Sequence, residues 1–106
     1  MIVATIDVLP GYEVVEVFGL VRGATVRAGH LGGDISALLT NIVGGEVGEY
    51  TKLLAEAREQ ALDRMTAEAR ALGANGIIGT RFTGTEIASG AAEMLVYGTA
   101  VKLLKI

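Results

Sequence analysis

The 106-residue chain has no cysteine, a single histidine and a single proline, and each shortage excludes a class of protein. Without cysteine there is no disulfide framework, thiolate metal site or cysteine nucleophile. One histidine excludes a cluster of several histidines within one chain. The net charge is −3 and the isoelectric point is about 5.0, so the chain lacks the basic patch that a nucleic acid partner requires.

Long apolar runs are also missing. The longest stretch without a charged residue covers 35–45, well short of the roughly 18 apolar residues that a membrane-spanning helix needs. The N-terminus, Met1–Asp7, has neither the positive charge nor the long apolar segment of a signal peptide. We therefore expect no membrane partner and a cytoplasmic location.

Apolar residues are abundant, by contrast. They make up 51% of the chain, which also has 15 glycines. The length predicts one domain over 1–106, and a domain of this size buries only about two-thirds of the surface of its unfolded chain. The excess predicts that copies of the chain cover one another in a homo-oligomer.

Extended segments rich in β-branched residues predict most of the sheet. The second segment is expected to bend or bulge at Gly23, and it and the last segment are apolar on both faces, which predicts burial on both sides. The predicted strands cover 2–6, 13–28, 77–86 and 91–104.

Two helices are predicted between the strands. A short, almost entirely apolar helix over 34–43 begins with Asp34 as its cap, and a long amphipathic helix runs from about 46–49 to Leu72. Small residues on the apolar face of the long helix predict a close approach to a sheet or to another subunit; they are Ala57, Ala61 and Ala69. Gly73 is expected to end this helix, and Asn75–Gly76 to turn the chain. The expected fold is α+β, with an antiparallel sheet, one long helix and one short helix.

The glycine-rich segments do not form a nucleotide-binding motif. Gly73 follows a helix and leads into a strand, whereas a dinucleotide-binding loop follows a strand and opens a helix. The only serines, Ser36 and Ser89, do not sit in a nucleophile elbow. We predict no catalytic residues, no bound cofactor and no enzymatic activity.

Three residues are weak candidates for a metal site. His30 lies on the loop that leaves the long strand, and an imidazole there can act as a ligand or be an ordinary surface side chain. Glu86 and Glu93 flank the loop of the last hairpin. Two carboxylates meeting there could bind a divalent cation, and the alternative is that both are solvated.

Arg81 is unusual because it falls in the middle of a predicted strand. Alternation places it on the face of Ile77 and Thr83. One interpretation is that Arg81 lines a pore or a polar pocket between subunits and holds an anion there. The other is that it forms an ion pair with Glu93 on the neighbouring strand.

Four segments together resemble one known family. They are Asn41–Lys52 (NIVGGEVGEYTK), Ala57–Leu62 (AREQAL), Ala69–Gly79 (ARALGANGIIG) and Tyr97–Val101 (YGTAV). The chain resembles the YbjQ-like family, also called UPF0145, which is described as a heavy-metal-binding domain family. The resemblance spans nearly the whole chain. It implies a dodecin-like α+β subunit that assembles into a ring, most often a pentamer.

The sequence departs from the family at one loop, where Glu46 and Val47 follow two glycines that often precede Arg-Ser in members. The chain has no cysteine and only one histidine, His30, so it offers little support for a heavy-metal site. The leading hypothesis is therefore a ring-forming homo-oligomer, expected to be a homopentamer, that acts as a binding or scaffold protein. Metal binding through carboxylates and His30 at subunit contacts is the alternative.

Overall fold

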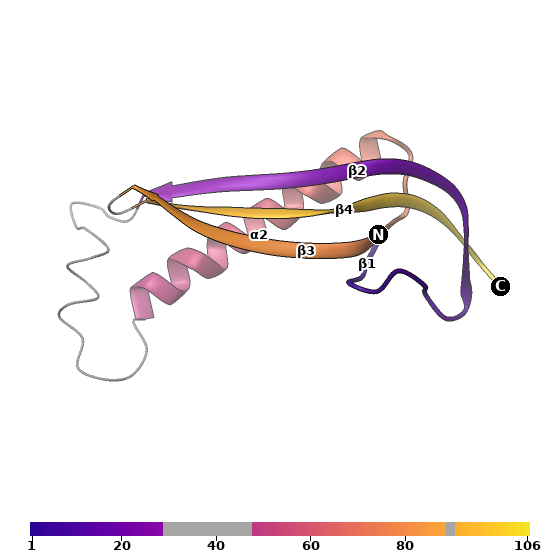
Figure 1. Cartoon of the computed structure of the whole chain (residues 1–106), viewed down its shortest axis with the longest axis horizontal. Coiled ribbons are helices and arrows are strands. Elements are labelled where there is room, and N and C mark those ends of the chain that lie inside the picture. The colour runs from indigo at the N-terminus through magenta and orange to yellow at the C-terminus, as the bar shows by residue number, and fades with distance from the viewer. Residues whose placement is uncertain (29–47, 89–90) are drawn as a thin grey trace.

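The computed structural model describes residues 1–28, 48–88 and 91–106, so His30 and the predicted helix over 34–43 lie outside the described residues. Four strands and one long helix follow in the order β1, β2, α2, β3, β4 (Figure 1). Their bounds are β1 Ile2–Val3, β2 Tyr12–Ala28, α2 Gly48–Ala71, β3 Gly76–Ala88 and β4 Ala91–Lys105. The α+β prediction is confirmed. No helix among these residues is long and apolar enough to cross a membrane.

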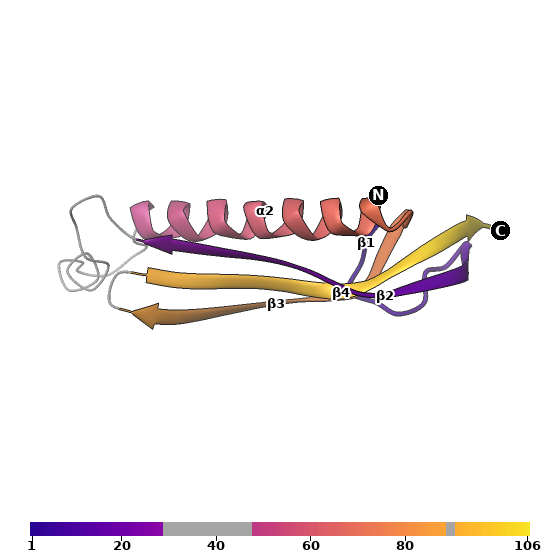
Figure 2. The ribbon, with the colours of Figure 1, turned by 90° about the horizontal axis from the view of Figure 1, so that it is seen from above.

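The strands form one sheet in the order β1-β3-β4-β2, and α2 runs along only one of its faces (Figure 2). β4 pairs antiparallel with β2 and β3, but β1 pairs parallel with β3. The prediction of a purely antiparallel sheet is therefore wrong, because the N-terminal segment runs beside β3 in the same direction. The Ile2 N–H donates to the Asn75 carbonyl at 3.1 Å and the Ala4 N–H to the Ile77 carbonyl at 2.9 Å.

α2 packs on the sheet through small side chains, as predicted. Ala57, Ala61 and Ala69 are at most 2% exposed, and Met65 lies fully buried among them. The helix ends at Ala71, and Gly73 just beyond it has a φ of +91°, a left-handed conformation that glycine adopts without strain. The Gly73 N–H bonds the Arg70 carbonyl and the next N–H bonds the Ala69 carbonyl, which is the pattern of a Schellman cap.

Gly23 brings the helix and β2 together instead of bending the strand. A Cβ at this position would lie 1.9 Å from the backbone oxygen of Ala61 and 2.6 Å from the backbone nitrogen of Met65. Real Cβ atoms do not approach this closely, so only glycine fits here. The prediction of a bend or bulge at Gly23 is wrong, because the register with β4 runs unbroken through it.

The irregularities of β2 lie earlier, between Val14 and Glu16 and between Val17 and Gly19. Each adds an unpaired residue and shifts the alternation of side chains between the two faces. A single chain does not bury both faces of this strand, since Val17 and Leu20 are 64% and 63% exposed.

A third irregularity changes where Arg81 points. The register between β3 and β4 shifts between Ile78 and Arg81, and Gly79 within it has a φ of +61°. Ile77 is fully buried in the core beneath α2, whereas Arg81 is exposed. The prediction that Arg81 shares a face with Ile77 is wrong because the bulge reverses the alternation, although Thr83 remains on the face of Arg81.

Candidate functional site

Three side chains from three strands form a row on the sheet face opposite α2. Arg22 of β2 and Arg81 of β3 are the register partners of Tyr97, which lies on the central strand β4. Paired residues of antiparallel strands point to the same face. That face is the one away from the helix, because the neighbouring Val96 is fully buried in the core beneath α2. We call Arg22, Tyr97 and Arg81 the Arg–Tyr–Arg row.

The rows next to it carry no charge. On one side Leu20, Thr99 and Ile78 are paired, and on the other Ala24, Leu95 and Thr83. The first acidic residue along β4 on this face is Glu93, paired with Val26 and Thr85. Glu93 is four residues from Tyr97, which is about 14 Å along a strand. The Asp7 carboxylate does approach this part of β3, since one of its oxygens would lie 3.1 Å from a Cβ at Gly79, so the two arginines do not form an isolated positive patch.

Arg81 is held in place by the backbone. Its Nη1 donates to the Thr5 carbonyl at 2.9 Å and to the Thr80 carbonyl at 2.8 Å. Among the described residues the structure shows no ion pair between Arg81 and Glu93. The side chain therefore lies over the contact between β3 and the N-terminal segment, on the side of β3 away from Tyr97.

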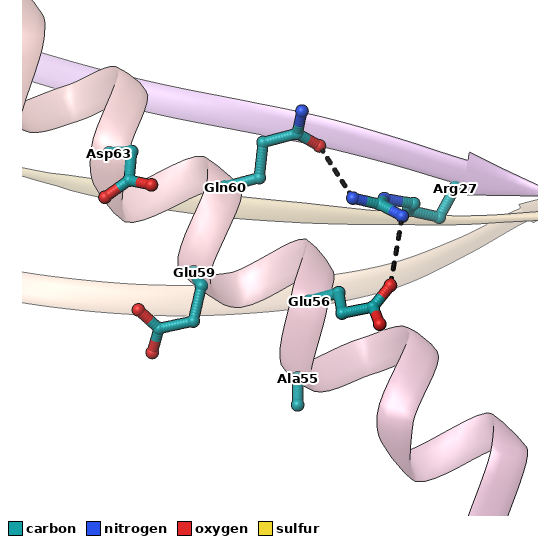
Figure 3. Close-up of a pocket in the computed structure, with 6 residues that line it drawn as sticks. All are labelled: Arg27, Ala55, Glu56, Glu59, Gln60 and Asp63. Atoms are coloured by element: carbon teal, nitrogen blue, oxygen red, sulfur yellow. Dashed lines mark hydrogen bonds and ion pairs between the residues drawn. The ribbon is translucent and has the colours of Figure 1, made fainter.

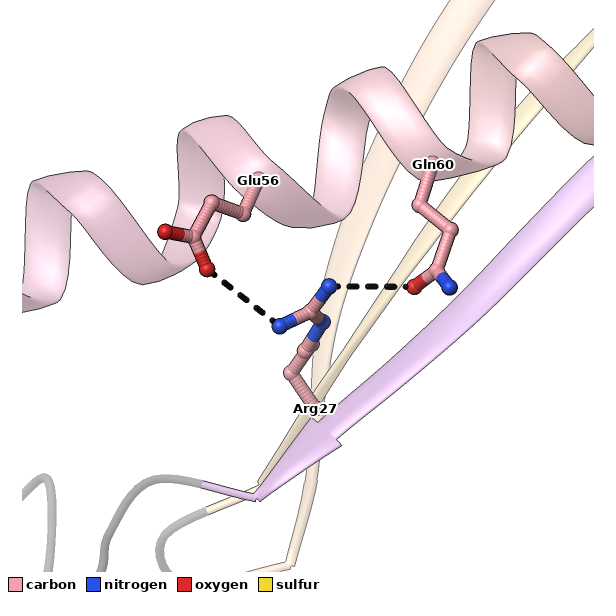
Figure 4. A network of polar contacts seen from close by, with 3 residues as sticks. All are labelled: Arg27, Glu56 and Gln60. Carbon is pink, nitrogen blue, oxygen red and sulfur yellow. Dashed lines mark hydrogen bonds and ion pairs between the residues drawn. The ribbon is translucent and has the colours of Figure 1, made fainter.

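The other polar cluster lies between α2 and the end of β2. Arg27 donates from Nη1 to Glu56 at 3.3 Å and from Nη2 to Gln60 at 3.2 Å (Figure 4). These residues line a shallow hollow of about 440 Å³ (Figure 3). Glu59 and Asp63 also line the hollow, but they point away from Arg27 in Figure 3.

This cluster is a surface contact with little chemistry of its own. The side chains of Arg27 and Glu56 are 33% and 47% exposed, and solvent-exposed ion pairs contribute only about 0–1 kcal/mol. Within the described ranges, no three histidine, cysteine or acidic side chains are grouped so that they could hold a metal ion.

α2 also covers part of the free edge of β2. The Arg22 backbone N–H donates to Glu68 Oε1 at 3.3 Å, and Arg64 Nη1 donates to the Ala24 carbonyl at 2.6 Å. The Arg22 N–H and the Ala24 carbonyl both point outward from β2, on the side where no strand pairs with it among the described residues. Side chains one helical turn apart therefore satisfy edge groups that another strand could otherwise pair with.

Asn75, predicted as part of a turn, has a more specific role. Its Nδ2 donates to the Leu103 carbonyl at 2.9 Å, and its Oδ1 accepts from the Leu103 N–H at 2.6 Å. The side-chain amide thus pairs with β4 as a peptide group of a neighbouring strand would. The next residue is Gly76, which fits closely against the same strand, since a Cβ at this position would lie 2.4 Å from Leu103 Cδ1.

The predicted metal candidates do not meet within one chain. Glu86 is the register partner of Ala92, whereas Glu93 is the partner of Thr85, so the two carboxylates lie on opposite faces of the hairpin. The expectation that they meet at the hairpin loop is wrong for a single chain. His30 lies outside the described residues. The donors that can be described do not fit a heavy-metal site within one subunit.

Sequence reasoning identified Arg81 but missed its companions in the row. Arg22 and Tyr97 belong to strands that are far apart in the sequence, and alternation does not reveal which residues of such strands lie side by side. The sequence does show that Arg22 and Tyr97 are polar residues within otherwise apolar strands, and this is the one feature that could have indicated them.

A family model and individual relatives place the chain in the same protein family. Residues 1–104 match a family model, YbjQ_1, described as "Putative heavy-metal-binding". A UPF0145 protein of Thermus thermophilus is 52% identical over 103 residues, covering 97% of this chain and 90% of that protein. A UPF0145 protein of Pyrococcus horikoshii is 52% identical over 106 residues, covering 100% and 91%.

A solved structure supports the fold. The crystal structure of a protein of unknown function of the DUF74 family from Pediococcus pentosaceus matches with a TM-score of 0.61 and 16% identity, over 98% of each chain. At this identity the match shows the fold alone. The family model and the curated relatives together show that this chain belongs to the YbjQ-like, UPF0145 family.

Proposed function

We propose that the protein is a ring-forming homo-oligomer, expected to be a homopentamer with a dodecin-like subunit, and that it acts as a binding or scaffold module without catalytic activity. The observation that carries the proposal is an apolar strip along the edge strand β2. Its members are Val15 (51% exposed), Val17 (64%), Leu20 (63%) and Val26 (57%). Long apolar edge strands in soluble proteins are normally covered, because they associate with other chains.

The dimensions of the subunit support the proposal. The radius of gyration is 17.0 Å, whereas a compact domain of this length has about 13 Å. The extents of 53 × 25 × 16 Å describe a thin plate, in which one helix layer and one sheet layer leave a large area exposed. A second copy is the occupant that we propose for the strip.

Within the part of the chain that the structure describes, the sheet has two different open edges, which favours a ring over a simple dimer. One is β2, and the other is the far half of β3, since β1 spans only two residues. Phe82 is 46% exposed on that half. If the β2 edge of one copy contacts the β3 edge of the next, the contact is heterologous, and such contacts close into rings when the rotation permits.

The test is the mass of the assembly in solution. Sedimentation of the wild-type chain at micromolar concentration is expected to give a multiple of the subunit mass of 11.0 kDa. The variant Val17→Lys/Leu20→Lys places two charges in the strip and is expected to dissociate the assembly. Leu72→Lys is the control. It places a charge at an exposed leucine directly after the C-terminal end of α2, outside the strip, and it should leave the assembly intact.

A wild-type chain that sediments as a monomer near 11.0 kDa contradicts the proposal. So does a double variant that assembles as the wild type does. Circular dichroism of each variant shows whether it has folded, so that a loss of assembly is separated from a loss of structure.

Metal binding is the second candidate, and the description of the family is the observation that favours it. The carboxylates of Glu86 and Glu93 lie on opposite faces of one chain, so such a site would need residues of several subunits. Metal analysis of protein purified without chelator, repeated on His30→Ala and Glu93→Ala, decides the question. Stoichiometric metal that either substitution removes supports the site, and unchanged substoichiometric metal excludes it.

A cytoplasmic location belongs to the same proposal. Imaging of a fluorescently tagged chain in its host cell tests it, and a signal at the cell envelope would contradict it.

A further inference from the structure

We propose that Asn75–Gly76 is a site of spontaneous deamidation, and that the pairing of the Asn75 side chain with Leu103 holds the reaction back in the folded chain. The fold thus controls a covalent modification whose co-reactant is water. The inference does not depend on the proposed assembly, because both hydrogen bonds that carry it lie within one chain.

The sequence supplies the chemistry of the reaction. The backbone nitrogen of Gly76 attacks Cγ of Asn75, the new N–C bond closes a succinimide ring, and Nδ2 leaves as ammonia with the proton of the Gly76 N–H. Water then opens the ring at either carbonyl, which gives aspartate or isoaspartate. Glycine favours this ring closure because it has no Cβ to hinder the attacking nitrogen. The other asparagine, Asn41, precedes the β-branched Ile42 and is expected to react more slowly.

Burial does not protect Asn75, because this residue is exposed to water. Its side-chain amide is instead tied to the backbone of β4. Nδ2 donates to the Leu103 carbonyl at 2.9 Å, and Oδ1 accepts from the Leu103 N–H at 2.6 Å. The two bonds hold both ends of the amide against β4. For the reaction, the amide must turn so that Cγ faces the Gly76 nitrogen, and this turn breaks both bonds.

Gly76 is restrained as well. It is buried, and it is the register partner of Ile2 on one side and of Val101 on the other. A ring that includes its nitrogen therefore forms only when the sheet opens locally at this end of β3 and β4. Such openings occupy a small fraction of the time in a folded chain, so the reaction is slowed in proportion.

The products do not fit the contact that the amide makes. A carboxylate at position 75 has no N–H to donate to the Leu103 carbonyl, and it places a negative charge beside that oxygen. Isoaspartate adds a methylene group to the backbone just before β3. Either product weakens the pairing that had prevented the reaction, so deamidation also loosens the end of β4.

The experiment compares the full chain folded in a mildly alkaline buffer with the same chain unfolded by guanidinium chloride in that buffer. Chromatography and mass spectrometry of proteolytic peptides separate unreacted Asn75 from its two products over time. We expect Asn75 to react at least about tenfold more slowly in the folded chain. In the unfolded chain it should react faster than Asn41. Equal rates in the folded and unfolded chains overturn the proposal, and so does an Asn75 that reacts no faster than Asn41 when unfolded.

Leu103→Ala tests whether the pairing with β4 provides the protection. The Leu103 side chain is 6% exposed and lies against Gly76, so its removal loosens the end of β4 while both backbone groups remain. We expect Asn75 in the folded variant to react about tenfold faster than in the folded wild type. Leu104→Ala is the matched control, because it makes the same change at a neighbouring leucine that is 58% exposed.

The control should react as the wild type does, and circular dichroism shows whether each variant is folded. An unchanged rate in a folded Leu103→Ala chain, or an equal acceleration in Leu104→Ala, overturns the role of the pairing. If Leu103→Ala does not fold, the comparison of folded and unfolded wild type still decides whether the fold holds the reaction back.

Discussion

Gly23→Ala is the most direct test of how α2 is held against the sheet. The new Cβ would lie 1.9 Å from the Ala61 carbonyl oxygen, where contacts under 3.0 Å essentially never occur, so the helix backbone must retreat by about 1 Å. Both Ala61 and Met65 are fully buried at this contact, so the retreat loosens the core on either side. Overpacking of this kind costs about 1–3 kcal/mol, and a backbone obstacle places the cost near the upper value.

Gly84→Ala is the matched control in the neighbouring strand β3. Its nearest neighbour would be the Met94 Cε atom at 3.3 Å, the end of a flexible side chain that can move aside. Neither glycine has a positive φ, so both substitutions add the same methyl group to ordinary strand backbone. We expect Gly84→Ala to change the free energy of unfolding by less than about 1 kcal/mol, partly because alanine restricts the unfolded chain.

The assay is thermal unfolding followed by circular dichroism, with all chains at one concentration because association changes apparent stability. A cost of about 3 kcal/mol lowers the melting temperature of a domain of this size by roughly 12–24 °C. A Gly23→Ala chain as stable as the wild type would refute the close approach. An equal loss in Gly84→Ala would mean that any added methyl group, rather than this contact, is responsible.

Three further substitutions test the polar contacts. Asn75→Ala removes both hydrogen bonds to the Leu103 backbone and is expected to cost about 1–3 kcal/mol in urea denaturation, and an unchanged midpoint would show that the pairing is not needed. Arg27→Ala should cost less than about 1 kcal/mol in the same assay because its ion pair is exposed, and a larger loss would contradict this. Arg64→Ala uncovers the Ala24 carbonyl and should increase light scattering at high concentration, whereas an unchanged signal would show that the helix does not protect this edge.

The order of the elements and the lengths of α2 and the three long strands could be predicted from the sequence because local patterns encode them, whereas β1 covers only Ile2–Val3 of the strand predicted over 2–6. Ala57, Ala61 and Ala69 predicted the buried face of α2, and all three are buried. Gly73 predicted the end of the helix, where it has a positive φ. In these cases, residues a few positions apart in the chain determine the outcome.

The placement of side chains across the sheet could not be predicted in the same way. A bulge between Ile78 and Arg81 moved Arg81 to the other face, and nothing in the alternation marks where a strand gains an extra residue. The separation of Glu86 from Glu93 has the same origin, since it depends on the register of the hairpin. Each of these features depends on pairing between strands, which periodicity along one strand does not specify.

α2 leaves only part of the edge of β2 open to another copy. Glu68 and Arg64 occupy the edge groups of Arg22 and Ala24, so a strand of another copy cannot pair with the middle of β2. The open part, Tyr12–Gly19, contains both bulges, which interrupt a regular ladder. Contacts between copies should therefore depend more on the apolar strip than on backbone pairing, which makes a closed assembly more favourable than continuous growth of sheets. Leu20 and Val26 of the strip lie on the sheet face opposite α2, on either side of Arg22, so a copy that covers the strip also lies over this part of the Arg–Tyr–Arg row.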